Sequence, residues 1–494
     1  MPRTPLAASL QRIALEAHAT RRQFLGAAGA AALVAAAGAP RARAASTQKV
    51  VVVGAGLAGL TAAHRLKQAG VIADVYEASS RLGGRCWSAR GVFADGQVAE
   101  HGGELIDTGH LEIRQLCKEL RLPLDNLLQG EQNGTEPLYY FDGAPYTYGE
   151  AAEDFNGVYQ ALHRDVSEAS YPTTHLISTA AGRALDDMSI TQWIETRVPG
   201  GNRSKLGQLL DVAYDIEYGA PSSDQSALNL LYLLGYSGQG QLRLFGPSNE
   251  KYHVRGGNDQ IVSELAKRLG SQIRTGWALT AIRRSGSGYE LSFGTRKVTA
   301  DRVVLAIPFS IMRAKVDWSG AGFSELKGRA IRELGMGTNV KLNVGFSSRH
   351  WRSLGCNGDT YADTGYQATW EVSRAQPGTS GILVDYLGSL GVDFTGSANA
   401  RAKGFLGQIE PVLPGITQRW DGRATLDHWP SNPWTLGSYS YYRVGQYQEF
   451  GGAESDIEGA VHFCGEHTTQ DFQGYLNGAV FTGERVAGEV LDAL

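Results

Sequence analysis

A glycine-rich segment near the start of the chain has the residue types and spacing that bind phosphate groups. Residues 54–59, Gly54-Ala55-Gly56-Leu57-Ala58-Gly59, have the spacing G-x-G-x-x-G and directly follow the four valines at 50–53. In this context Gly54 makes a tight turn, Gly56 lets the backbone approach a pyrophosphate, and Gly59 lets a helix pack on a strand. The segment therefore predicts a dinucleotide site.

The flanking residues predict the elements that must position these glycines. Residues 50–53 are typical of a buried parallel strand, and residues 60–66 of a helix ending near Gly70. The helix N-terminus offers unpaired N–H groups to the phosphates. A second strand over 73–77 ends at Glu77, which is placed to accept hydrogen bonds from ribose hydroxyls. The acid favours a nucleotide with a free ribose 2′-hydroxyl over NADP. It does not by itself separate FAD from NAD.

Three motifs together resemble the flavin-containing amine oxidase family, which includes monoamine, polyamine and L-amino-acid oxidases. They are V-V-V-G-A-G-L-A-G-L at 51–60, E-A-S-S-R-L-G-G-R at 77–85 and E-H-G-G-E at 100–104. The resemblance implies FAD, with Arg85 as the cation at its pyrophosphate and Gly102-Gly103 beside the isoalloxazine ring, where glycine allows close approach. The other contacts that it implies in this region are Ala78, Arg81, Gly84, Glu104 and Leu105.

Further segments extend the resemblance over nearly the whole chain after residue 46. Residues 252–269, 302–308, 461–468 and 474–479 match the family, and they imply FAD contacts from Leu279, Gly465, Glu466, Gly474, Tyr475 and Leu476. The helix opened by the last segment would point its N-terminus at the flavin. We expect an α/β and α+β protein with a Rossmann-like FAD-binding domain from 45–115, 250–310 and 430–494. Segments 116–249 and 311–429 are expected to form a substrate domain of mixed sheet and helices.

The resemblance also implies three catalytic residues. Lys341 matches the lysine that holds a water at flavin N5, although the alternating pattern around it alone favours a solvent-facing strand lysine. Tyr439 and Tyr475 match two aromatic residues that flank the substrate amine. Ser438 stands where mitochondrial-type monoamine oxidases have the cysteine that carries a covalent flavin, so we predict non-covalent FAD.

The implied reaction is oxidation of the C–N bond of a primary or secondary amine, with O2 reduced to H2O2. An L-amino-acid oxidase remains an alternative: no arginine stands beside Glu104 to bind a carboxylate, but Arg90, Arg243 or Arg443 could come from elsewhere. An FAD-dependent desaturase or dehydrogenase is a second alternative. Glu104 itself could bind the distal ammonium of a diamine or could be a structural carboxylate.

The composition and the N-terminal sequence indicate which partners to expect and where the protein is located. The net charge is −4 without a basic run, which predicts no nucleic-acid partner. The four cysteines form no metal-binding or disulfide pattern, and no metal site is predicted. Residues 1–44 contain Arg21-Arg22, an apolar stretch too short to span a membrane, and an A-x-A site, which resembles a twin-arginine export signal. We therefore expect an exported protein. The sequence leaves open whether it forms a homodimer.

Overall fold

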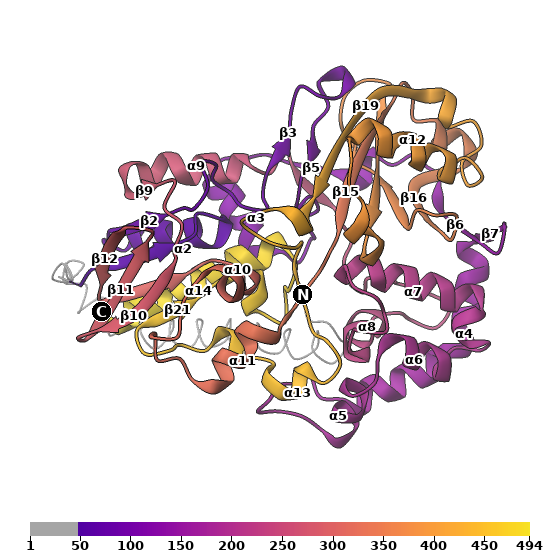
Figure 1. Cartoon of the computed structure of the whole chain (residues 1–494). Helices are drawn as coiled ribbons and strands as arrows, with labels where there is room; N and C mark the ends of the chain where they lie inside the picture. Colours follow the sequence, from indigo (N-terminus) through magenta and orange to yellow (C-terminus); the bar gives the residue numbers. More distant parts are fainter. Residues whose placement is uncertain (1–47) are drawn as a thin grey trace, which may run out of the picture.

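A computed structural model of the chain describes residues 48–494 (Figure 1). The predicted export signal at 1–44 lies outside the described residues. Over residues 48–494, no helix is long and apolar enough to cross a bilayer, and no group of three or more His, Cys, Asp or Glu is arranged to hold a metal ion. The four cysteines are all buried and unpaired.

A five-stranded parallel sheet carries the glycine-rich turn. Its strand order is β21-β13-β1-β2-β9, with the bounds Val461–Phe463, Arg302–Leu305, Val50–Val53, Ala73–Tyr76 and Ile273–Arg274. All four pairings are parallel, and the strands come from three distant stretches of the chain. The strands predicted near 50–53 and 73–77 are therefore neighbours at the centre of this sheet.

Alternate residues of β1 face two different cores, which explains why all four valines are buried. Val50 and Val52 pack in one core with helices α2 (Leu57–Gln68), α9 (Gln260–Leu269) and α14 (Leu476–Ala493). Val51 and Val53 pack in another core that contains the strands β11 (Gly288–Phe293) and β12 (Arg296–Ala300). These two strands and β10 (Ala281–Ser285) form a three-stranded antiparallel sheet, seen beside β21 in Figure 1.

A seven-stranded mixed sheet forms the second part of the molecule. Its order is β19-β15-β18-β17-β16-β6-β7, with the bounds Trp420–His428, Val340–Phe346, Gly381–Leu387, Ala368–Glu371, Cys356–Ala362, Glu136–Phe141 and Ala144–Thr147. Helix α12 (Ala398–Ile409) packs on it next to β19 and β15 (Figure 1). This mixed sheet with its helices agrees with the expected fold class.

Most of the remaining helices lie together on the other side of this sheet (Figure 1). They are α4 (Tyr148–Glu168), α5 (Ala180–Asp186), α6 (Ile190–Arg197), α7 (Lys205–Tyr218) and α8 (Ala227–Leu234). Helices α4 and α6 each begin with a capping box, at Thr147 and Ser189. In each box the hydroxyl accepts the backbone N–H of the residue three positions later, and the side chain of that residue accepts the backbone N–H of the cap. Helix α7 contacts β6, β16 and β17, so it packs directly on the sheet.

The other elements connect these parts. They are α3 (Leu111–Glu119), α10 (Phe309–Lys315), α11 (Glu325–Glu333) and α13 (Gln446–Phe450), with the short pairs β3–β4 (Ser88–Ala89, Ala99–Glu100), β5–β8 (Leu124–Asn126, Tyr252–Val254) and β14–β20 (Gly335–Met336, Ser440–Tyr441). Helix α3 crosses the expected boundary at 115 and packs in the same core as α2.

Candidate functional site

The glycine turn has the geometry that its spacing predicts. Gly54 has φ +102°, and its N–H donates to the carbonyl of Tyr76 over 2.7 Å. A Cβ on Gly59 would lie 2.0 Å from the Gly54 carbonyl oxygen, so only glycine lets α2 approach β1 this closely. A Cβ on Gly56 would meet no atom within 4 Å. Gly56 therefore faces open space rather than packed protein.

That space is a cavity of about 800 Å³ at the carboxyl edge of the parallel sheet. It is lined by residues that follow β1, β2, β13 and β21, the edge where open α/β sheets bind ligands. All the residues predicted to contact FAD or to act in catalysis line it except Ala55 and Gly59: Gly54, Gly56, Leu57, Ala58, Glu77, Ala78, Arg81, Gly84, Arg85, Gly102, Gly103, Glu104, Leu105, Leu279, Lys341, Tyr439, Gly465, Glu466, Gly474, Tyr475 and Leu476. Ala55 instead donates its N–H to Glu77 over 2.7 Å.

Two helices present their N-termini to this cavity. Helix α2 begins at Leu57 and α14 at Leu476, both residues line the cavity, and neither helix has a side-chain cap. The first N–H groups of a helix have no intrahelical partner and carry partial positive charge, so they suit the negative charge of a phosphate or of an electron-rich ring. With the opening at Gly56, these residues fit a flavin dinucleotide.

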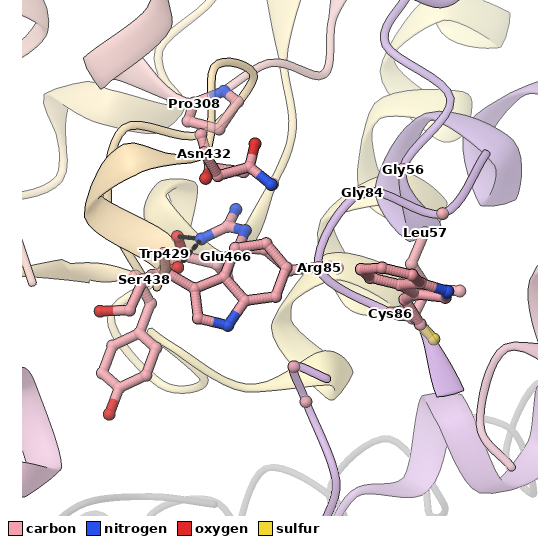
Figure 2. Close-up of a pocket in the computed structure, with 18 of the residues that line it drawn as sticks. Gly56, Leu57, Gly84, Arg85, Cys86, Pro308, Trp429, Asn432, Ser438 and Glu466 are labelled. Carbon is pink, nitrogen blue, oxygen red and sulfur yellow. Dashed lines mark hydrogen bonds and ion pairs between the residues drawn. The ribbon is translucent and has the colours of Figure 1, made fainter. Parts of the chain in front are cut away.

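Arg85 and Glu466 form an ion pair on the cavity wall, which Figure 2 shows with Ser438 beside it. Arg85 Nη1 donates to Glu466 Oε1 and to the Ser438 carbonyl, each over 2.7 Å. Burial raises the pKa of Glu466, but the opposing field of Arg85 outweighs it and leaves the pKa below its ordinary value. Glu466 thus neutralises part of the positive charge of Arg85, the residue that the resemblance places at the pyrophosphate.

Lys341 is 2% exposed, so the solvent-facing interpretation of its spacing is wrong. Strand β15 is buried along its whole length: β18 and β19 pair with its edges, α12 packs on one face, and the segment 102–104 covers Lys341 on the other. The sequence pattern cannot show these contacts. The Lys341 ammonium forms an ion pair with Glu104 and donates to the Gly102 carbonyl over 3.2 Å. Trp370 Nε1 donates to the other Glu104 oxygen over 3.1 Å. Burial raises the pKa of Glu104, but Lys341 outweighs this and the pKa ends below its ordinary value.

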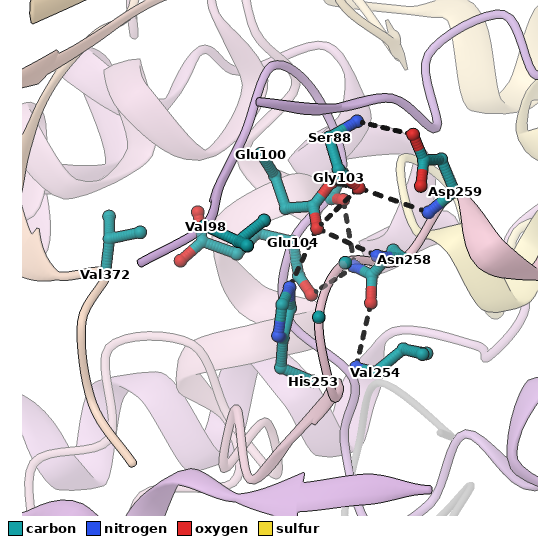
Figure 3. Close-up of polar contacts among 12 residues, drawn as sticks. Ser88, Val98, Glu100, Gly103, Glu104, His253, Val254, Asn258, Asp259 and Val372 are labelled. Atoms are coloured by element: carbon teal, nitrogen blue, oxygen red, sulfur yellow. Dashed lines mark hydrogen bonds and ion pairs between the residues drawn. The ribbon is translucent and has the colours of Figure 1, made fainter. Parts of the chain in front are cut away.

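A buried polar network holds the segment that carries Glu104 (Figure 3). Asn258 Nδ2 donates to the carbonyls of Gly103 and Glu104 over 3.1 and 2.7 Å. The Asn258 N–H donates to Glu100, which also accepts from His253 over 2.8 Å. Burial lowers the pKa of His253, yet its bond to Glu100 outweighs this and raises the pKa above its ordinary value.

Tyr439 and Tyr475 both line the cavity, as the resemblance implies. The hydroxyls of Tyr439 and Tyr386 lie 3.0 Å apart, and Tyr439 also donates to the carbonyl of Ile216 over 3.2 Å. Tyr475 donates to Glu217 over 3.2 Å. Burial raises the pKa of Tyr439 well above its ordinary value, so its phenol stays neutral. Both rings are therefore held by their hydroxyls at the same end of the cavity.

Sequence reasoning missed several residues at this end. Glu217 lies in the last turn of α7, Glu250 lies in the loop before β8, and Asp359 lies in β16. Phe245, Tyr361, Thr369, Trp370 and Tyr386 complete the same wall. They belong to segments without a recognisable motif, so no local signal identifies them.

The three arginines that could have bound a substrate carboxylate lie elsewhere. Arg90 pairs with Asp259, Arg443 pairs with Asp224, and Arg243 is exposed. None of the three lines the cavity.

Comparisons with known proteins agree with the fold and identify the family. The model of the family described as "Flavin containing amine oxidoreductase" matches residues 57–491. AofH of Mycobacterium tuberculosis, which carries the name of a flavin-containing monoamine oxidase, is 26% identical over 90% of this chain and 96% of its own length. Nicotine dehydrogenase of Pseudomonas putida is 26% identical over 96% of this chain and 98% of its own. A structure of putrescine oxidase bound to putrescine has the same fold, with a TM-score of 0.75 at 21% identity, over 90% of this chain and 99% of that one.

Proposed function

This chain belongs to the family of flavin-containing amine oxidoreductases and is a flavin-dependent amine oxidase, and we propose that it oxidises a primary or secondary amine to an imine, with O2 reduced to H2O2. The imine then hydrolyses to a carbonyl compound and an amine or ammonia. The observation that carries this proposal is that Tyr439, Tyr475 and Lys341 line the same cavity as the dinucleotide-binding glycines. This shared cavity supports a cofactor site that lies next to an aromatic substrate site.

The cofactor of the proposal is FAD, bound without a covalent link. When bound, the flavin supplies the redox step by accepting a hydride equivalent from the carbon beside nitrogen. Gly56, Glu77 and the N-termini of α2 and α14 are the groups that would hold it. Ser438 lines the cavity and donates its hydroxyl to Asn339 over 2.6 Å. Acid precipitation should leave the yellow colour in solution, and colour in the pellet would contradict non-covalent binding.

Lys341 is proposed to hold a water in the cavity. An ammonium has three N–H donors, and Glu104 and the Gly102 carbonyl take two of them. The third donor remains for a water. Glu104 is therefore a structural partner of Lys341 rather than a carboxylate free to bind a substrate ammonium, and this favours one of the two roles that the sequence left open.

Tyr439 and Tyr475 are proposed to form a slot for the reacting amine. Two ring faces exclude water and orient the nitrogen lone pair. The hydrogen bonds to Tyr386, Ile216 and Glu217 restrict how far the rings can turn.

An L-amino-acid oxidase is the second candidate, and the site supports it less well. A substrate carboxylate needs a cation, and the arginines at 90, 243 and 443 lie away from the cavity wall. An FAD-dependent desaturase or dehydrogenase, the third candidate, would reduce no O2.

A peroxide-coupled assay over monoamines, diamines and L-amino acids tests the proposal. We expect peroxide with amines and little with amino acids. A preference for amino acids would support the second candidate. FAD binding without peroxide from any amine would support the desaturase or dehydrogenase.

The proposal includes export through residues 1–44. Replacing Arg21 and Arg22 by lysine should leave the protein inside the cell, because this signal type depends on the arginine pair. Unchanged export of that variant would contradict the twin-arginine route.

A further inference from the structure

Glu104 carries a negative charge at a fixed place on the cavity wall. It belongs to the segment 102–105, whose residues all line the cavity, and the resemblance places this segment at the flavin. One carboxylate oxygen is paired with the Lys341 ammonium, and the other accepts from Trp370 Nε1 over 3.1 Å. The Glu104 side chain is 6% exposed, so protein donors rather than water hold both oxygens. The charge therefore stays where these two donors place it.

The backbone that carries Glu104 is held as firmly as its side chain. Asn258 Nδ2 donates to the carbonyls of Gly103 and Glu104, as Figure 3 shows. Gly103 packs on Leu476, the first residue of α14, so closely that an added Cβ would lie 2.6 Å from a side-chain carbon of Leu476. The segment therefore cannot move away from Lys341 without breaking these contacts.

Glu104 is the counter-charge of Lys341. Within residues 48–494, no other acid lies in ion-pair distance of the Lys341 ammonium. Asp427 stands opposite Lys341 in the register of β15 and β19, but both of its oxygens accept from His101 Nδ1, over 2.8 and 2.9 Å. The acid nearest along the sheet thus has a partner of its own, and Glu104 balances the lysine.

The other basic side chains of the cavity are placed differently. Arg81, Arg85 and Lys315 also line it, but Arg85 is paired with a different acid, and Arg81 and Lys315 donate to backbone carbonyls. Of these four basic side chains on the cavity wall, only Lys341 is buried. Water screens a buried charge weakly, so its field extends into the cavity. The pair with Glu104 is neutral as a whole, whereas either member alone would leave a full charge there.

We propose that Glu104 is a positioning residue that acts through Lys341: it holds the ammonium in place as a donor and cancels its charge, so that the cavity wall beside the flavin stays neutral. The inference rests on the proposed function, because it takes the bound group to be FAD with Lys341 beside its ring. A nearby positive charge favours a flavin that carries negative charge, and a nearby negative charge disfavours it. Lys341 and Glu104 should therefore affect the flavin with opposite signs, whereas two residues that only hold the fold together would not.

Sulfite binding tests this inference, because sulfite is an anion that adds reversibly to oxidised flavin and bleaches its visible absorbance. The FAD-loaded enzyme is titrated with sulfite, without amine, and the Kd is measured from the absorbance. Glu104→Gln should lower this Kd about tenfold, and Lys341→Met should raise it about tenfold. The flavin midpoint potential should rise in the first variant and fall in the second, by about 30 mV for each tenfold change in a two-electron equilibrium.

The double variant separates the charge of Glu104 from its contact with Lys341. When Glu104→Gln is added to Lys341→Met, the sulfite Kd should fall about tenfold relative to Lys341→Met alone, and return to within about threefold of the unaltered protein. Glu104→Asp keeps the charge and should also stay within about threefold of the unaltered protein. Asp427→Asn, which changes an acid on the neighbouring strand that does not line the cavity, is the matched control and should do the same. FAD content and melting temperature are measured for every variant.

Two results would overturn the inference. If Glu104→Gln leaves the sulfite Kd within about threefold in both backgrounds, the carboxylate does not act on the flavin. If Glu104→Gln and Lys341→Met shift the Kd in the same direction, the pair serves packing only. Neither result concerns amine oxidation, because sulfite binding needs no amine. Normal sulfite binding with no flavin reduction by any amine would instead refute the proposed function and leave this inference intact.

Discussion

Glu104 and Lys341 form an ion pair between side chains that are 6% and 3% exposed, although 237 positions separate them in the chain. Glu104 follows the two glycines expected at the flavin, and Lys341 lies in strand β15 of the seven-stranded sheet. The pair therefore joins the segment 102–104 on the cavity wall to the seven-stranded sheet. It also means that neither charge can be removed alone without leaving the other buried and unpaired.

Replacing Lys341 by methionine should keep FAD bound but slow flavin reduction or reoxidation by about 100-fold, because the water that the lysine holds would lose its donor. The unpaired Glu104 should also cost about 3–5 kcal/mol of unfolding free energy. Stopped-flow absorbance and chemical denaturation measure the two effects. Adding Glu104→Gln to this variant should restore most of the stability and none of the rate. Near-normal rates in both half-reactions would exclude the role of Lys341.

Gly56 and Gly59 should respond differently to alanine. An added Cβ at Gly56 enters open space, so Gly56→Ala should fold with an unchanged melting temperature as apoprotein but bind FAD about tenfold or more weakly. Gly59→Ala would collide with the Gly54 carbonyl and should reduce soluble yield. FAD titration by fluorescence quenching measures the first effect. Normal FAD affinity in Gly56→Ala would place the pyrophosphate elsewhere.

Tyr439 should act through its ring rather than through its hydroxyl. Tyr439→Phe loses the contacts to Tyr386 and Ile216 but keeps the ring, so kcat/KM should fall less than about threefold. Tyr439→Leu removes one face of the slot and should lower kcat/KM by about tenfold or more. Steady-state kinetics with one amine compare the two. Equal losses in both variants would mean that the hydroxyl, not the ring face, is what the reaction needs.

Asp385 should make the protein less stable as pH rises. It is 0% exposed, neither carboxylate oxygen has a partner within residues 48–494, and burial raises its pKa to about 8. The folded state therefore keeps a proton that the unfolded state loses near its ordinary pKa, so this group's contribution to stability falls from about pH 4 to about pH 8. Asp385→Asn cannot ionise and should flatten this part of the curve, relative to the unaltered protein, in denaturation measurements between pH 5 and 8.5. Parallel curves for the two proteins would show that Asp385 is not a buried titrating group.

The dinucleotide site could be predicted because its residues are contiguous and their roles are local. The valines at 50–53 form one strand, Gly54 needs a positive φ for the turn, and Glu77 directly follows the neighbouring strand. These requirements act on the backbone within about 25 residues, so the sequence states them directly. The resemblance extended the prediction to Lys341, Tyr439 and Tyr475, and the structure places all three on one cavity.

The tertiary structure alone decided which charged side chains lie together on the cavity wall. The sequence by itself determined a dinucleotide fold and, through its motifs, the family. It did not show that Lys341 is buried, because this burial depends on the distant segment 102–104 packing against the face of β15. Likewise, Glu217, Glu250 and Asp359 come from a helix, a loop and a strand with no motif, and only folding brings their carboxylates to one wall. Electrostatic interactions depend on distance and burial in space, which separation along the chain does not encode.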